Sequence, residues 1–196
     1  MTRNYALLPG CFITKSIYNR NMPDYRRIFI PGGTYFFTLV TYQRKPIFQN
    51  PTARAILREA WLTVARRHPF QTIAVCLLPD HLHCIWTLTH DADFSLRWKE
   101  IKKRFSHQYI KSVGRPEVDH PSRDKRGETA VWQRRFWEHL IRDETDFNHH
   151  LDYIHYNPVK HGLVEYADEW PWSTYRNFIQ ENLRNPDSGQ GLLLPG

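Results

Sequence analysis

Runs rich in aromatic and β-branched residues alternate along the chain with stretches whose apolar residues recur every three or four positions. The runs predict four strands, at 34–41, 70–78, 82–88 and 136–141. The periodic stretches predict helices from 51 or 52 to 67, from 95 to about 111, and from 143 to about 157. The strands at 70–78 and 82–88 are joined by Pro79-Asp80 and therefore predict a hairpin.

The residues at the ends of these stretches predict where each helix begins and ends. Pro51 suits a first turn, Ser95 is the expected cap of the second helix, and 143–146 is an acidic, cap-capable start for the third. Pro158 is expected to end the third helix, which puts Asn157 at or near the cap. Gly162 is expected to supply a left-handed turn after it.

The order of the first six elements predicts the fold. It is β-α-β-β-α-β, the ferredoxin-like pattern of the α+β class, with a four-stranded antiparallel sheet and two helices on one face. One helix is left over after the fourth strand. We expect one folded domain at 23–180, preceded by a basic arm at 1–22 and followed by a tail at 181–196.

Composition narrows the class of protein. With 196 residues, 41% of them hydrophobic, the chain can bury a real core. Lys and Arg number 27 against 20 Asp and Glu, a net charge of +7 that favours nucleic acid as a partner over an acidic membrane surface. Cys11, Cys76 and Cys84 are widely spaced and odd in number, so no disulfide framework is expected and a reducing cytosol fits. No apolar run reaches the roughly 18 residues of a membrane span, and no signal-peptide core is present.

His81-Leu82-His83 is the first candidate for chemistry. On a strand, side chains alternate between faces, so the two histidines project from one side while Leu82 and Cys84 point into a core. Two imidazoles on one face of a rigid strand make half of a site for a divalent ion. The alternative is a pair of ordinary polar residues on a solvated face. The spacing of Cys76, Cys84 and the histidines matches no zinc-finger pattern.

The helix from 143 carries the second half of the candidate site. Phe147, Leu151 and Ile154 share a core-facing stripe, and His150, Tyr153 and Asn157 share the neighbouring one. Tyr153 and Asn157 therefore point the same way and could belong to a functional site. The alternative is that Tyr153 only packs its ring against the protein and leaves its hydroxyl in solvent. The roles of three further side chains remain open. Tyr156 is a rival to Tyr153 and is expected to lie closer to the core face. His155 is expected to pack or to face DNA, and His149 and His150 are either accessory groups of the site or solvated surface.

The phrases "LLPDHLHCIW", "VWQRRFWEHLIRD" and "LDYIHYNPVKHGLV" resemble the REP-associated tyrosine transposases, relatives of the IS200-type single-tyrosine transposases in the HUH endonuclease group. The resemblance covers roughly 23–180. It implies a bacterial, cytoplasmic, nucleoid-associated nuclease and strand transferase that acts on single-stranded DNA folded into REP hairpins. It also implies that His81, His83 and Asn157 bind Mg²⁺ or Mn²⁺, that Tyr153 is the nucleophile, and that the protein is a monomer rather than a homodimer.

The implied chemistry is a metal-assisted attack of Tyr153 on a phosphodiester, giving a 5′-phosphotyrosine and a free 3′-OH. The covalent bond preserves the phosphodiester energy, so strand transfer needs no ATP. The alternatives are a domesticated hairpin DNA or RNA binding protein with little cleavage, and a metal-dependent hydrolase that uses activated water. Candidate phosphate contacts are Arg26, Arg27, Arg44, Lys45, Lys102, Lys103, Arg134, Arg135 and Lys160. Candidates for base stacking are Trp86, Trp132, Trp137, Trp170 and Trp172, of which we expect at least three to be core residues.

Overall fold

The computed structural model describes residues 27–116 and 129–184, and the side chains of 181–184 are left aside. The predicted arm at 1–22 lies outside this part of the chain, as do Arg26 and Cys11. The predicted tail begins inside a helix, α5, which spans Tyr175–Arg184. No helix of the described residues is both long and apolar enough to cross a membrane.

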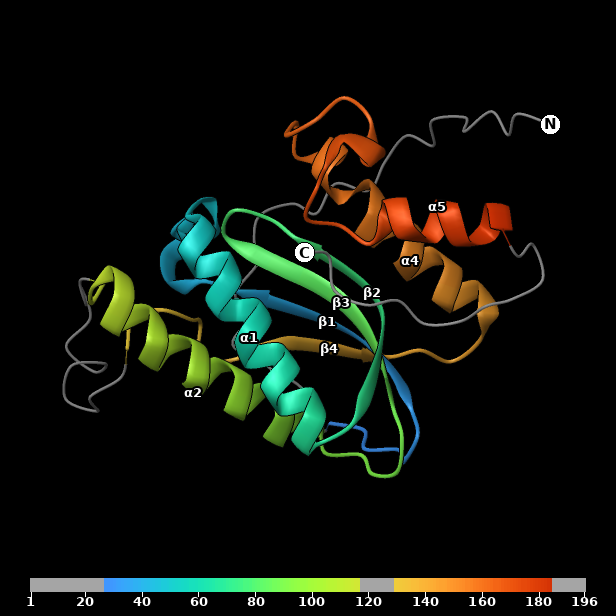
Figure 1. Cartoon of the computed structure of the whole chain (residues 1–196). Coiled ribbons are helices and arrows are strands. Elements are labelled where there is room, and N and C mark those ends of the chain that lie inside the picture. Colours follow the sequence, from blue (N-terminus) through green and yellow to red (C-terminus); the bar gives the residue numbers. More distant parts are fainter. Residues whose placement is uncertain (1–26, 117–128, 185–196) are drawn as a thin grey trace, which may run out of the picture.

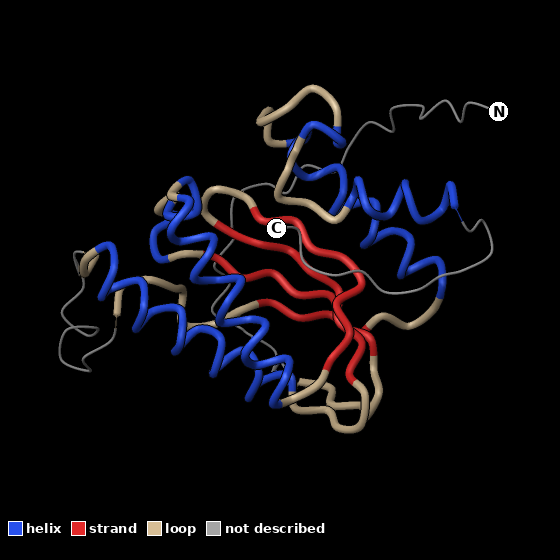
Figure 2. Tube along the Cα trace, in the orientation of Figure 1, coloured by secondary structure: helices blue, strands red, loops and turns tan. Residues whose placement is uncertain are grey.

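The predicted sheet is confirmed. It consists of β1 (Thr34–Val40), β2 (Phe70–Leu77), β3 (His81–Leu88) and β4 (Trp137–Leu140), with every neighbouring pair antiparallel. The strand order is β2-β3-β1-β4, as a ferredoxin-like topology requires. Figure 2 shows the four strands as one layer between two groups of helices.

Helices cover both faces of this sheet. The paired helices α1 (Pro51–Arg67) and α2 (Phe94–Val113) lie on one face, and α4 (Glu144–Lys160) lies on the other with α5 beside it (Figure 1). Strand alternation separates two cores. On one face, Phe37, Leu82 and Trp86 point toward α1 and α2. On the other face, Phe36 and Ile85 pack against Leu151 and Ile154 of α4 and form a separate cluster.

Two predicted helix ends are wrong. The cap of α2 is Asp93, whose carboxylate accepts a hydrogen bond of 2.8 Å from the Leu96 amide, while Ser95 accepts one from Arg27 instead. The third helix does not stop at Pro158, because α4 continues to Lys160 with the proline inside its last turn. At that position the ring forfeits only one backbone hydrogen bond. Gly162 follows with φ of 65°, the predicted left-handed turn.

A segment that was not predicted covers the outer edge of β2. The amide of Leu77 donates to the Trp172 carbonyl over 2.8 Å, and the amide of Thr174 donates to the Val75 carbonyl over 2.9 Å. Ser173 lies opposite Cys76 between these two bonds. An exposed edge strand is thereby paired by a short piece of chain almost one hundred residues further along.

Candidate active site

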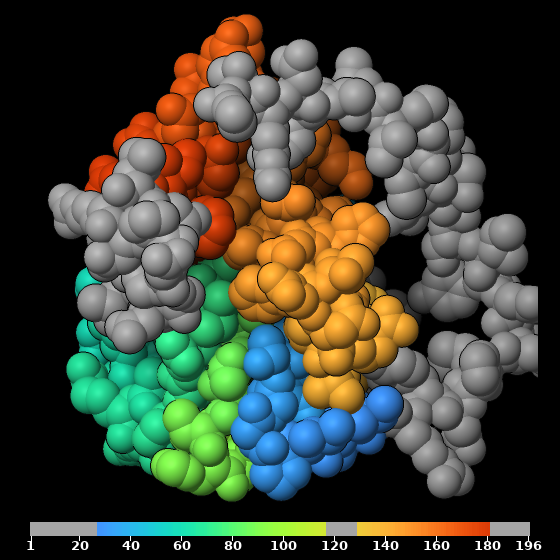
Figure 3. Space-filling view, turned by 90° about the vertical axis from the view of Figure 1, so that its right-hand side faces the viewer, coloured from blue at the N-terminus to red at the C-terminus, as the bar shows by residue number. Residues whose placement is uncertain are grey.

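The two histidines of β3 lie beneath α4, beside Tyr153. The ring centroids of His81 and His83 are 4.9 Å apart, and those of His83 and Tyr153 are 5.1 Å apart. Leu82 and Cys84 are fully buried on the other face of the strand, as the alternation predicts. The alternative of a solvated polar face is wrong, because α4 covers both histidines and leaves each of them 4% exposed. Figure 3 shows α4, in orange, lying against the blue segment that contains β1.

Each histidine is oriented by a hydrogen-bond partner at its Nδ1 atom. His81 Nδ1 lies 2.5 Å from Asp80 Oδ1, and His83 Nδ1 lies 2.8 Å from the hydroxyl of Thr38 on β1. Asp80 in turn receives a hydrogen bond of 2.9 Å from Arg44. A partner at Nδ1 fixes the ring and leaves Nε2 as the ligand atom, which is the usual arrangement around a metal-binding histidine.

Several polar atoms on β3 and α4 are buried without a hydrogen-bond partner in the described part of the chain. His83 Nε2 has no hydrogen bond among the described residues, and neither Nδ2 nor Oδ1 of the fully buried Asn157 has one there. Buried polar groups are normally paired, and leaving one unpaired costs about 1–3 kcal/mol. These unpaired atoms on β3 and α4 are available to a ligand.

Burial also sets the charge state of the site. Desolvation is the main reason why the pKa of His81 is lowered, although hydrogen bonding to Asp80 opposes the shift. Desolvation lowers the pKa of His83 well below its usual value, and the positive charges of His81, His161, Arg44 and Lys160 add to the effect. For Asp80, desolvation favours the neutral acid, but His81 and Arg44 outweigh it, and the pKa is lowered. A neutral imidazole with an unpaired Nε2 atom, as at His83, is what a divalent cation requires.

Tyr153 is half-buried at the mouth of the site. Its ring packs edge-on against Phe36, with centroids 6.0 Å apart, and the Lys160 ammonium lies 5.1 Å from its ring centroid. The prediction that Tyr156 lies closer to the core face is wrong, because its side chain is 55% exposed on the outer side of α4. His155 is a packing residue, since its ring lies against Tyr175 and Phe178, and burial lowers its pKa to about 4.

A polar cluster that sequence reasoning missed anchors the start of α4 to β4. His139 Nε2 lies 2.8 Å from Asp146, and Arg142 Nε donates to the same carboxylate over 2.9 Å. His150 stacks on His139 with centroids 4.6 Å apart, while His149 is exposed. Desolvation opposes ionisation of Asp146, but the hydrogen bonds from Arg142 and His139 prevail and hold its pKa well below the usual value.

Ligand atoms of His139, Asp146 and His150 lie within 4.8 Å of one another, the spacing of a cation site. In this structure the carboxylate is already paired with Arg142 and His139, and His150 Nδ1 lies 2.8 Å from the Asp146 carbonyl. We therefore interpret the cluster as the anchor that positions Tyr153 two turns further along α4. The acidic start at 143–146 was visible in the sequence, but its contact with His139 was not.

The described residues among the predicted phosphate contacts fall into three groups. Arg44 and Lys160 flank the histidines closely enough to lower the pKa of His83. Others are already engaged within the protein: Arg27 pairs with Glu138 over 3.0 Å, and Lys102 donates to the Gln133 carbonyl over 2.7 Å. The remaining described members are exposed or half-buried: Lys45, Lys103, Arg134 and Arg135.

The tryptophans divide between core and surface. Trp86 and Trp132 are buried, and Trp170 packs against the core beneath α4 while donating to the Leu77 carbonyl over 2.9 Å. Two of the five are therefore buried core residues, one fewer than expected, and Trp170 is half-buried against the core. Trp137 is 50% exposed and packs edge-on against Phe36, with centroids 5.5 Å apart. Trp172 is half-buried at the edge of β2.

Comparison with known proteins agrees with this fold. The family model described as "Transposase IS200 like" matches residues 31–157, which include all four strands and the residues of α4 up to Asn157. The chain belongs to this family of transposases. Within it, the chain is 43% identical to the REP-associated tyrosine transposase of Escherichia coli strain K12 over 163 residues, covering 83% of this chain and 88% of that one.

Two further relatives support the same placement. A putative REP-associated tyrosine transposase of Haemophilus influenzae is 40% identical over 169 residues, covering 86% of this chain and 94% of that one. A solved structure of a REP-associated tyrosine transposase bound to a REP hairpin superposes with a TM-score of 0.68 at 40% identity. That match covers 89% of this chain and 98% of the solved one. The resemblance to the REP-associated tyrosine transposases is thereby confirmed.

Proposed function

We propose that this protein cleaves and rejoins single-stranded DNA next to REP-type hairpins, with Tyr153 as the nucleophile. The observation that carries the proposal is the contact of Tyr153 with His83, which lies beside His81. One turn further along α4, the buried amide of Asn157 has no partner among the described residues. Two elements far apart in sequence, β3 and α4, supply these groups. A packing role alone gives no reason for placing a phenol beside polar atoms that have no partner.

The donor set fits a divalent cation. Nε2 of His81 and His83 and Oδ1 of Asn157 are the atoms that would hold Mg²⁺ or Mn²⁺. The observation that supports the fit is that His83 Nε2 and Asn157 Oδ1 are buried without a hydrogen-bond partner among the described residues. Mixed nitrogen and oxygen ligands suit Mn²⁺ well and Mg²⁺ acceptably. When bound there, the ion would supply Lewis acid polarisation of a phosphate oxygen.

The protein's own groups would perform the covalent step. The Tyr153 oxygen loses its proton and bonds to phosphorus, while the bond from phosphorus to the 3′ oxygen breaks and that oxygen leaves as a 3′-OH after taking up a proton. The Lys160 ammonium, 5.1 Å from the phenol ring, adds positive charge where the phosphate would lie. Attack by the 3′-OH of another strand reverses the same step, which accounts for strand transfer without ATP.

The proposed substrate follows from the relatives. One solved relative, 40% identical, is described as bound to a REP hairpin, and the net charge of +7 suits a polyanionic ligand. Arg44, Lys160 and His161 surround the candidate site on the side of Asp80 and α4. We assign to them the phosphates next to the scissile bond.

Covalent trapping tests the proposal. End-labelled single-stranded hairpin DNA from the same genome is incubated with the protein and Mn²⁺, then resolved on a denaturing protein gel. We expect a metal-dependent adduct that Tyr153→Phe abolishes and that the matched control Tyr156→Phe retains, because Tyr156 faces solvent. Binding without an adduct would indicate a hairpin-binding protein. Cut DNA without an adduct would indicate a hydrolase that uses activated water.

A further inference from the structure

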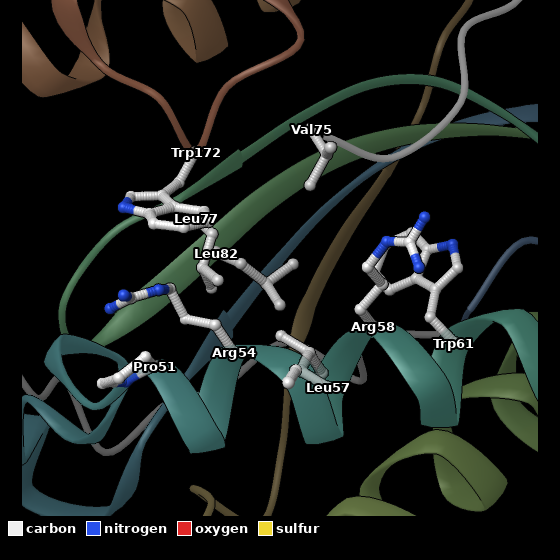
Figure 4. Close-up of a pocket in the computed structure, with 10 residues that line it drawn as sticks. Pro51, Arg54, Leu57, Arg58, Trp61, Val75, Leu77, Leu82 and Trp172 are labelled. Atoms are coloured by element: carbon white, nitrogen blue, oxygen red, sulfur yellow. The ribbon is translucent and has the colours of Figure 1, made fainter. Parts of the chain in front are cut away.

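A second recess lies on the face of the sheet opposite to the histidines. It has a volume of about 220 Å³ and lies between α1 and the edge strand β2 (Figure 4). Its apolar lining comprises Leu57, Trp61, Val75, Leu77 and Leu82. Leu82 stands between His81 and His83 but points the other way, so the recess and the candidate active site are separated by one layer of sheet.

Trp172 forms one wall of this recess and is held by two contacts. Its carbonyl accepts the hydrogen bond from Leu77 that joins the 172–174 segment to β2. The guanidinium of Arg54 lies 4.1 Å from the centroid of the indole ring and supports it. A half-buried aromatic ring that is fixed before any ligand arrives loses little conformational entropy on binding.

Two arginines one helical turn apart stand at the two ends of the recess, as Figure 4 shows. Arg54 donates to the carbonyls of Phe48 and Gln49 over 2.7 and 2.9 Å, yet its buried Nε has no partner among the described residues. Arg58 is exposed and forms no hydrogen bond or ion pair with residues 27–116 and 129–184. The recess therefore combines apolar walls with one unsatisfied donor and one uncommitted cation.

We propose that this recess binds a single unpaired nucleotide of the DNA, its base between the apolar walls and its phosphate on Arg58. The proposal rests on the DNA-binding part of the proposed function. The volume is below the roughly 300–1,000 Å³ of sites for larger ligands, which suits one heterocycle and excludes a base pair. Aromatic walls stack with any base, guanidinium groups match phosphate oxygens, and an acceptor on the base edge would satisfy Arg54 Nε.

Nuclear magnetic resonance of the indole N–H groups of the full chain tests the site without any metal or cleavage. The probes are the four deoxynucleoside 5′-monophosphates, deoxynucleosides alone and inorganic phosphate alone. We expect the Trp61 and Trp172 signals to shift saturably with a monophosphate, and Trp170 to stay unchanged because its ring packs in the cluster on the α4 face of the sheet. Arg58→Ala should weaken binding about tenfold, as loss of a charge-assisted hydrogen bond predicts.

The matched control is Arg67→Ala, which removes the same charge from an exposed position of α1 outside the recess and should leave binding unchanged. Three results would each overturn the nucleotide site. They are equal weakening of binding by both variants, Trp61 and Trp172 signals that do not shift, and full shifts with inorganic phosphate alone. Because the assay needs no adduct, a protein that fails to cleave can still pass it, and one that cleaves can still fail it.

Discussion

The Lys160 ammonium lies 5.1 Å from the ring centroid of Tyr153, a residue that stands two turns earlier on α4. A separation of seven residues puts the two side chains on the same face of the helix. Pro158 does not break this arrangement, because α4 continues through the proline to Lys160. Lys160 is exposed, whereas the ring it covers is half-buried. The cation is thus held between the candidate nucleophile and solvent, where a phosphate would approach.

Lys160→Ala should slow adduct formation more than it weakens DNA binding. The loss of one phosphate contact lowers the slope of log affinity against log salt by about one, whereas the loss of a cation at the reacting phosphate acts on the rate itself. Rates of adduct formation and a salt titration of hairpin binding measure the two effects. Lys99→Ala, an exposed lysine on α2 across the sheet, is the control. Equal effects of the two variants on rate would contradict the assignment.

Asp80→Asn should weaken metal binding about 10- to 100-fold, because it removes the carboxylate that orients His81 through its Nδ1 atom. The expected signature is cleavage that recovers when Mn²⁺ is raised, since the ligands themselves remain. Electron paramagnetic resonance of free Mn²⁺ measures the affinity directly. An Asp80→Asn protein with unchanged Mn²⁺ affinity would show that Asp80 serves only to pair with Arg44.

Asn157→Leu should abolish cleavage while leaving the metal-free protein at least as stable as the parent. The amide of Asn157 is buried without a partner among the described residues, so an apolar side chain of similar volume removes a desolvation cost of about 1–3 kcal/mol. Urea unfolding without metal gives the comparison. Added Mn²⁺ should raise the midpoint of the parent more than that of the variant. A marked loss of stability in the metal-free variant would mean that Asn157 has a structural partner after all.

His155 should make the protein sensitive to mild acid. Burial lowers its pKa in the folded state to about 4, below the value of about 6.5 expected in the unfolded chain. The unfolded state therefore binds more protons between these values, and stability falls as the pH drops from about 6.5 toward 4. The full effect is on the order of 3 kcal/mol. Urea unfolding of the parent and His155→Phe at pH 7 and pH 4.5 should show a smaller loss in the variant, and identical losses would refute this explanation.

Local pattern in the sequence was sufficient for the four strands, for α1, α2 and α4, and for the shared faces in the candidate site, but not for α5 or the 172–174 segment. Strand alternation placed His81 and His83 on one face and Leu82 on the other, and helical periodicity put Tyr153 and Asn157 on a stripe beside Leu151 and Ile154. These inferences succeed because side-chain direction in a helix or strand depends on residues within one or two turns. The same locality explains the errors at Ser95 and Pro158, because nearby residues could equally well begin or end the helix there.

Contacts between distant parts of the chain were decided only by the tertiary structure. Burial lowers the pKa of both His81 and His83 and leaves Nε2 of His83 without a partner among the described residues, and this burial depends on α4 lying over them. The pairing of His139 with Asp146, and of Trp172 with Leu77, arises from how strands and helices stack. The sequence by itself determined which side chains share a face. Only packing determined which faces meet, because that choice minimises exposed apolar area over the whole chain at once.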